Sequence, residues 1–280
     1  MLDRLAGRLG PAALLLPAVA LLAVVFVLPL LRLLELSFSD PAGAATPYVE
    51  LLHDPIYRKV FAATAWVAVA VTAITVLLGY PFALALARAP LRWRVILFAC
   101  VLTPLWISVL VRTFSWMLLL ETNGPVNRLL VAGGIVERPL ALLFNQTGVL
   151  IGMVHVLLPY AVLPIYAALV RVDPALLRAS EGLGASPART FLRVLLPLSM
   201  PGVATGGAFV FLLSLGFFIT PALLGGASSI TLSMLIDGFV NERLVWPLAA
   251  AASMILLAAT LAFLAMAARF VAPAAVAEVR

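Results

Sequence analysis

The chain has 280 residues, of which 64% are hydrophobic and only 11% are charged, and its formal net charge is +6. A soluble domain carries about 25% charged residues, so this composition excludes an ordinary soluble enzyme or binding domain. It predicts an integral membrane protein.

Cysteine and lysine usage narrows the chemistry further. Cys100 is the only cysteine, so no intrachain disulfide and no cysteine metal site can form. The only lysine, Lys59, does not follow a glycine, so the phosphate-binding GxxxxGK[ST] loop is absent. If ATP is used, another chain must bind it.

The apolar residues fall into runs long enough to cross a bilayer. A membrane helix needs about 20 apolar residues to cross a hydrocarbon core about 30 Å thick. Such runs fill the sequence, so we expect residues 1–280 to form one all-α transmembrane domain without a separate soluble part. The six predicted spans are about 11–31, 60–87, 95–118, 148–170, 202–222 and 247–269.

The first of these runs, residues 11–31, resembles a signal peptide because the small residues 42–45 follow it. A signal core is usually about 7–15 residues long and lies close to its cleavage site. This run is longer, and the small residues lie too far beyond it. We therefore predict an uncleaved first span.

Two ionisable side chains lie well inside predicted spans. Arg112, in the third span, either extends to the outer headgroups or lines a pore. His155, in the fourth, is either a hydrogen-bonded packing residue or a functional one. In the fifth span, Gly202 and Gly206 form a GxxxG pattern, which lets a neighbouring helix approach closely.

Residues 173–202 are neither a clean apolar span nor an ordinary loop. Asp173 and Ser186 are each followed by proline, a helix-start signal in which the side chain caps the first turn. Between them, Gly182 and Gly184 end the first helix, since glycine tolerates the left-handed conformation. The sequence predicts two short helices around a glycine turn, closed by the prolines that follow. Four arginines lie in this hairpin or directly before it: Arg171, Arg178, Arg189 and Arg193.

The distribution of Lys and Arg predicts the orientation of the chain, because these residues are enriched in cytoplasmic loops. With the N-terminus inside, cytoplasmic segments hold 11 of the 18 Lys and Arg residues and outer segments hold seven. The bias is sharpest in the turn 88–94, which has three arginines. We expect both termini and the hairpin to lie in the cytoplasm, where a charged hairpin is suited to docking. A hairpin without a partner is the plainer alternative.

The hairpin has the spacing A-S-x-x-L-G-A-S followed by F-x-x-V-x-L-P. This spacing resembles the EAA loop of permease subunits of binding-protein-dependent ABC importers. Arg178 stands where that family has a glutamate, and Ser180 replaces its second alanine. The resemblance implies that the hairpin is a coupling helix seated in a groove of an ATPase. The coupling residues that it implies are Arg178, Ala179, Ser180, Glu181, Leu183, Gly184, Ala185 and Ser186.

Four further segments resemble the spermidine/putrescine branch of these permeases: GPVNRLL, RPLALL, LPYAVLPIYAAL and SLGFFITPALLGG. The resemblance implies the six-helix fold of type I ABC importers in a bacterial inner membrane. It implies three partners: a second permease subunit, a cytoplasmic ATPase dimer that binds ATP and Mg²⁺, and a periplasmic substrate-binding protein. This chain would bind no cofactor and would pass a polyamine inward by alternating access.

A polyamine is a flexible cation, and aromatic faces attract cations without a fixed charge. Candidate residues of the translocation path are Arg112, His155, Tyr160, Ser214, Phe217 and Phe218. Helix packing explains the aromatic ones equally well. Two alternatives stay open: the same machine carrying an anion such as a phosphonate or opine, and a membrane scaffold that binds an ATPase without transport. No catalytic motif, metal-ligand cluster or nucleic-acid surface is found, so we predict neither an enzyme nor a metal site.

Overall fold

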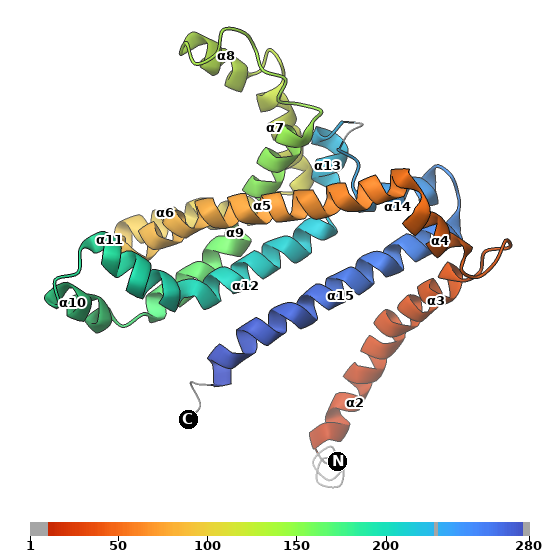
Figure 1. Ribbon diagram of the computed structural model, residues 1–280, viewed down its shortest axis with the longest axis horizontal. Coiled ribbons are helices and arrows are strands. Elements are labelled where there is room, and N and C mark those ends of the chain that lie inside the picture. Colours follow the sequence, from red (N-terminus) through yellow and green to blue (C-terminus); the bar gives the residue numbers. More distant parts are fainter. Residues whose placement is uncertain (1–10, 227–228, 277–280) are drawn as a thin grey trace, which may run out of the picture. The chain divides into compact units, whose positions relative to one another are not determined.

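The computed structural model describes residues 11–226 and 229–276, and every regular element within them is a helix (Figure 1). The all-α expectation is confirmed for this part of the chain. The chain divides into two compact units, Met1–Tyr57 with Ile236–Leu257, and Arg58–Leu235 with Ala258–Arg280. Both chain ends, which we expect in the cytoplasm, fall outside the described residues.

The first unit begins with a helix that runs unbroken from residue 11 to 37. A π-helical stretch, η1 (Ala23–Val27), separates α2 (Pro11–Leu22) from α3 (Leu28–Ser37). The helix continues past the predicted end at residue 31, where Arg32 Nη1 donates to Glu35 Oε2 at 2.8 Å one turn later. The segment Leu15–Ser37 is long and apolar enough to cross a membrane. The unit also holds α4 (Thr46–His53), most of α14 (Leu232–Asn241) and the start of α15 (Trp246–Val276).

The second unit contains the remaining helices and the hairpin. Its elements are α5 (Pro55–Arg88, from residue 58), α6 (Leu91–Trp106), α7 (Val109–Leu120), α8 (Pro125–Ala132), α9 (Gln146–Arg171), α10 (Pro174–Gly182), α11 (Pro187–Thr190), the π-helical η2 (Phe191–Leu195), α12 (Leu196–Leu215) and α13 (Ile219–Leu224). The hairpin α10–α11 lies at one end of this unit, away from α7, α8 and α13 (Figure 1).

Helices α9 and α12 lie side by side and in close contact (Figure 1). Gly202 and Gly206 of α12 make this possible. A Cβ at Gly202 would overlap that of Ala168 and lie 2.7 Å from the carbonyl oxygen of Pro164. A Cβ at Gly206 would lie 2.9 Å from the carbonyl oxygen of Ala161. The close approach predicted from the GxxxG pattern is confirmed.

Helix α5 completes the core of this unit. The hydroxyl groups of Tyr80 on α5 and Ser199 on α12 form a 2.8 Å hydrogen bond. The Tyr80 ring also meets Phe191 edge-on, with 5.8 Å between centroids. A Cβ at Gly79 would be only 3.4 Å from that of Ala161 on α9. Helices α5, α9 and α12 therefore form one packed body.

The predicted third span, residues 95–118, differs from the structure because it is broken. Helix α6 and the pair α7–α8 meet at an angle of 103°. Ile107 and Ser108, at the break, have extended ψ angles of 133° and 137°. Pro104 has no N–H to donate to the carbonyl of residue 100, which weakens the last turn of α6. The described residues thus contain five helices of spanning length, or six if the bent pair is one span.

The fifth span also differs, because it does not begin at residue 202. Helices α11, η2 and α12 form one helical run from Pro187 to Leu215. Pro197 follows directly on the π-helical turn η2, and Pro201 lies within α12. The prolines expected to close the hairpin lie inside this run. The second limb of the hairpin is therefore continuous with a membrane helix.

Gly206→Ala should destabilise the second unit, whereas Gly207→Ala should be tolerated. A Cβ at 206 would press on the backbone of Ala161, while one at 207 would meet methyl groups of Thr72 and Val76 at 3.7 Å, an ordinary contact. Both changes bring the same gain in helix propensity, so their difference isolates packing. We expect Gly206→Ala to cost about 1–3 kcal/mol, seen as a lower melting temperature in detergent. Equal melting temperatures would contradict the close packing.

Candidate functional site

The hairpin is built by the capping chemistry that the sequence indicates. The backbone N–H of Ala175 donates to Asp173 Oδ1 at 2.8 Å, and that of Arg189 donates to Ser186 Oγ at 3.4 Å. Gly184 has φ = +79°, a left-handed conformation that favours glycine. Gly182, in contrast, is the last residue of α10 and stays helical. The turn therefore depends on one glycine of the two.

A hydrogen bond that the sequence did not reveal joins the two limbs. Ser180 Oγ on α10 lies 3.0 Å from Thr190 Oγ1 on α11, and the Thr190 side chain is buried. Ser180 stands where the EAA loop that the hairpin resembles has its second alanine. Its hydroxyl is used inside the hairpin, where an alanine could form no such bond.

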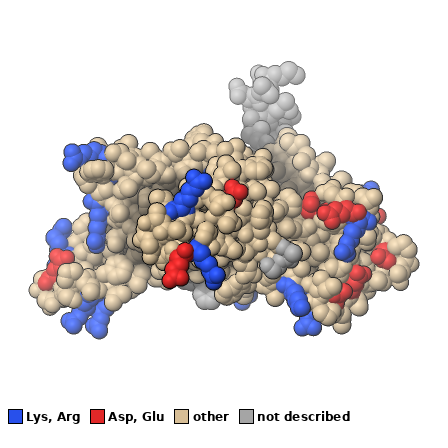
Figure 2. Space-filling view, turned by 90° about the horizontal axis from the view of Figure 1, so that it is seen from above, with Lys and Arg blue, Asp and Glu red and all other residues tan. Residues whose placement is uncertain are grey.

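The outer surface of the hairpin presents most of the predicted coupling residues. Leu183, at the tip, is 90% exposed, an unusual position for a large apolar side chain. Ser180 and Ala185 are partly buried, and the other six residues of this set are exposed. Figure 2 shows basic side chains gathered at the end of the second unit that carries the hairpin. Arg171, Arg178, Arg189 and Arg193 are all exposed there.

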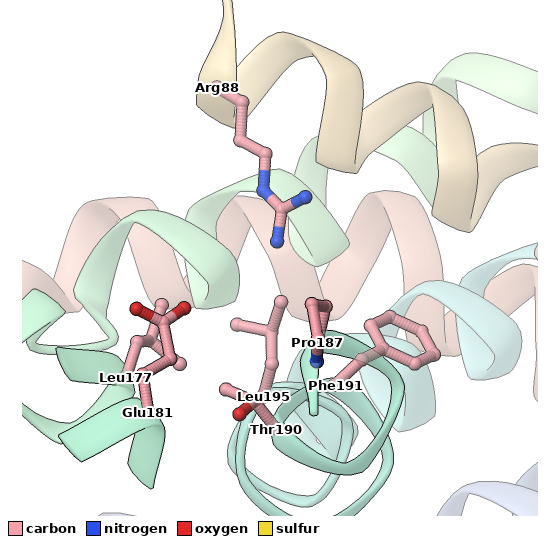
Figure 3. Close-up of a pocket in the computed structure, with 7 residues that line it drawn as sticks. All are labelled: Arg88, Leu177, Glu181, Pro187, Thr190, Phe191 and Leu195. Atoms are coloured by element: carbon pink, nitrogen blue, oxygen red, sulfur yellow. The ribbon is translucent and has the colours of Figure 1, made fainter. Parts of the chain in front are cut away.

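A hollow of about 250 Å³ lies between the hairpin and the end of α5 (Figure 3). Arg88 points into it from α5, and Glu181 and Leu177 line it from α10. Its other lining residues are Pro187, Thr190, Phe191 and Leu195. Among the described residues, no ion pair joins Arg88 to Glu181. Arg88 and Glu181 thus line the same hollow without forming an ion pair across it.

A second group of predicted residues meets where α7 packs on α9. The indole Nε1–H of Trp116 donates to His155 Nδ1 at 3.1 Å, and the two rings meet edge-on, 5.6 Å between centroids. Because Nδ1 accepts, the ring proton of neutral His155 belongs on Nε2. Arg112 is close enough to His155 and Tyr160 to interact with both electrostatically. This set is called the α7–α9 cluster: Arg112, Trp116, His155 and Tyr160.

The other candidate residues of the translocation path differ in how far they are buried. Ser214 is buried and donates to the carbonyl of Val210 at 2.7 Å, within its own helix. Phe217 packs against the core of α5, α9 and α12. Phe218 and Tyr160, by contrast, are 38% and 40% exposed and present aromatic rings at the surface. Ser214 and Phe217 thus make contacts within the unit, whereas Phe218 and Tyr160 are partly exposed, and a role of these four residues in a translocation path stays a prediction.

Two further polar contacts were not foreseen. Thr113 Oγ1 lies 3.1 Å from Thr220 Oγ1, which ties α7 to α13. Asn127, a buried residue of α8, bonds the backbone N–H and C=O of Leu140 and so fixes the loop after that helix. Nothing in their spacing distinguishes these residues from ordinary loop or helix positions. No cluster of His, Cys, Asp and Glu within the described ranges is arranged to hold a metal ion.

Residues 76–271 match the family described as "Binding-protein-dependent transport system inner membrane component". The chain belongs to this family. The matched range begins within α5 and includes the hairpin and the α7–α9 cluster. This inner-membrane component is thus multi-pass, as its apolar helices require.

Similar proteins are known by sequence and by structure. This inner-membrane component is 35% identical over 223 residues to the spermidine/putrescine transport system permease protein PotB of Escherichia coli K12, covering 79% of this chain and 80% of that protein. The PotB protein of Haemophilus influenzae is 33% identical over 238 residues, covering 82% and 83%. A bacterial alginate ABC transporter, solved in complex with an alginate pentasaccharide-bound periplasmic protein, is 19% identical, has a TM-score of 0.75 and covers 92% of each chain. That structural likeness concerns the fold alone.

Proposed function

We propose that this chain is the permease subunit of an ATP-driven importer that passes a polyamine, such as spermidine or putrescine, into the cytoplasm. The observation that carries the solute is the 35% identity to a spermidine/putrescine permease over 79% of the chain. The chain itself is the translocation subunit. ATP and Mg²⁺ are bound and ATP is hydrolysed by a separate ATPase, and this chain holds no cofactor of its own.

The hairpin is the coupling element that seats in the ATPase. Shape supports this role: the exposed Leu183 projects at the tip, and Gly184 holds the turn behind it. Ser180 locks the two limbs together from inside. A large apolar side chain that is exposed to water is typical of a binding surface, and at the end of a hairpin it is suited to a groove in the partner. The coupling residues are those of the loop Arg178 to Ser186.

Charge plays the smaller part in this docking. Arg178 is exposed and opposite in sign to the family's glutamate, so the family's usual ion pair cannot form. Glu181 lies one turn later and is also exposed, but it lines the hollow that Arg88 enters. An exposed ion pair is usually worth about 1 kcal/mol or less. Loss of one such pair is therefore tolerable where the shape of the turn is kept.

Alternating access follows from how the hairpin is connected. Its first limb follows α9 directly, its second limb is continuous with α12, and these two helices are packed at glycine contacts. When the ATPase dimer closes, displacement of the hairpin therefore moves both membrane helices as one body. The loaded periplasmic protein would release its solute to the outward-facing path, and a second permease subunit would form the other wall.

Aromatic faces in the path suit a polyamine. Tyr160 and Phe218 present half-exposed rings, and a cation above an aromatic face is attracted by about 0.5–2 kcal/mol. Such attraction binds a flexible cation without trapping it. One observation favours the rival anionic solute: Arg112 is a buried positive charge that interacts electrostatically with Tyr160.

The N-terminus, the C-terminus and the hairpin are proposed to face the cytoplasm, on the basis of the arginine bias. Leu91→Cys, in the arginine-rich turn, and Leu129→Cys, on α8, test this in a Cys100→Ala background, since both leucines are highly exposed. An impermeant thiol reagent added to intact cells should label residue 129 and spare residue 91. Labelling of residue 91 before the membrane is opened would reverse the orientation.

Uptake of labelled spermidine and putrescine tests the proposed solute. Cells lacking this chain should lose uptake, and the wild-type chain should restore it. Tyr160→Phe, which keeps the aromatic face, should restore most of the uptake, while Tyr160→Ala should restore several-fold less. Restored uptake of an anionic solute such as a phosphonate, with no polyamine uptake, would overturn the proposal.

A further inference from the structure

A second hollow, of about 270 Å³, lies where the ends of three apolar helices meet. Arg88, the last residue of α5, lines it together with Arg94, in the first turn of α6, and the end of α9 contributes as well. The other lining residues are all apolar: Leu84, Ala87, Leu169, Val170, Val172, Pro174, Leu177 and Leu195. This space, called the basic hollow, therefore combines two cations with an apolar wall.

Neither arginine is neutralised within the part of the chain that the structure describes, where the only ion pair joins Arg32 to Glu35. Arg88 is exposed, and its side chain extends freely from the end of α5 (Figure 3). Arg94 Nη2 donates to the carbonyl oxygen of Ala89 at 3.1 Å, which orients the guanidinium. Its Nε is enclosed by the chain, but its Nη1 is not. Both charges are thus within reach of a ligand from outside the chain.

The acidic side chains nearest to the basic hollow do not supply a counter-charge. Asp173 Oδ1 accepts from the backbone N–H of Ala175 and so caps α10. Glu181 lines the other hollow, in which it forms no ion pair with Arg88. Neither carboxylate is among the described residues that line the basic hollow. A ligand that carries its own negative charge would complete it.

The basic hollow lies at the level of the lipid headgroups. Helices α5 and α9 are long and apolar enough to cross a membrane, and they end at Arg88 and Arg171. Trp93, in the turn after α5, is 52% exposed, and the guanidinium of Arg92 lies 5.9 Å from the centre of its ring. Exposed tryptophan is typical of the boundary between hydrocarbon and headgroups. The anions present in quantity at this level are lipid phosphates.

We propose that Arg88 and Arg94 hold the phosphate of an anionic phospholipid, of which phosphatidylglycerol is the simplest example. Guanidinium groups match phosphate oxygens with two parallel hydrogen bonds, and basic pockets between membrane helices suit lipid headgroups. The apolar wall, with Val170 at the surface, receives the start of an acyl chain. This site is separate from the translocation path, and it requires neither a polyamine nor a particular orientation of the chain.

The bound lipid would also join the hairpin to the membrane helices. Pro174 and Leu177 of α10 line the basic hollow together with the ends of α5 and α9. A phospholipid seated there contacts all three elements at once. The first limb of the hairpin is thus held to the membrane surface by the lipid as well as by its own chain.

Native mass spectrometry of the complete transporter, purified in mild detergent with added phosphatidylglycerol, counts the lipids that this chain retains when it is released. The double variant Arg88→Gln/Arg94→Gln should retain at least fivefold less lipid than wild type. Arg92→Gln is the matched control, since Arg92 is an exposed arginine of the same turn that does not line the hollow, and it should retain the wild-type amount. Equal losses in both would show only general attraction of a basic turn for anionic lipid and would overturn the inference.

Val170→Trp tests the site with both arginines in place, and so does not depend on the folding of the double variant. Val170 is 56% exposed, so a larger side chain is accommodated there while it fills the hollow. Retention of phosphatidylglycerol should fall several-fold. Retention at the wild-type level would mean that the lipid is bound elsewhere, which contradicts the proposed site.

Two further probes distinguish the sources of the negative charge. Phosphatidylcholine, which has the phosphate but no net charge, should be retained several-fold less than phosphatidylglycerol, and an excess of inorganic phosphate should leave the retained lipid unchanged. Displacement by inorganic phosphate would show that the hollow takes a free anion. A wild-type chain that retains no lipid would leave the arginines to a carboxylate of a protein partner. Either result would overturn the inference.

Discussion

The contact between α9 and α12 at Gly202 and Gly206 is the constraint on which the rest of the molecule depends. Two glycines let the helix backbones touch where any side chain would force them apart. Because the hairpin limbs adjoin these same helices, we propose that a displacement of the hairpin moves α9 and α12 together. The Tyr80–Ser199 hydrogen bond joins α5 to this packed pair. In the proposed mechanism, a more loosely packed pair of helices would transmit less of the displacement of the hairpin.

The distribution of charged side chains along the second unit is consistent with docking at the hairpin. Arginines gather on and around the hairpin, where water and a partner can meet them. Within the packed region that the structure describes, Arg112 alone carries a buried charge, and it lies in the α7–α9 cluster rather than near the hairpin. The exposed arginines of the second unit thus lie at the hairpin, whereas its buried arginine lies between α7 and α9.

The sequence predicted the features that arise from local chemistry. Asp173 and Ser186 cap as expected because capping needs only a few neighbouring residues, and Gly184 takes the left-handed turn for the same reason. The break after α6 and the continuity of α11 with α12 were missed, because proline tolerance depends on the surrounding helices and on a π-helical turn. The Ser180–Thr190 bond and the burial of Arg112 were invisible too, since both arise from residues brought together only by folding.

Gly184 is where coupling between the ATPase and the membrane helices can be tested most directly. A Cβ at Gly182 or at Gly184 meets no atom within 4 Å, yet only Gly184 has a positive φ, so Gly182→Val and Gly184→Val differ in backbone strain rather than in space. The measurement is ATP hydrolysis stimulated by the loaded binding protein, in vesicles that hold the complete transporter. If the shape of the turn carries coupling, stimulation survives in Gly182→Val and is lost in Gly184→Val. Intact stimulation in Gly184→Val, with loss in Arg178→Ala, would show that charge carries it instead.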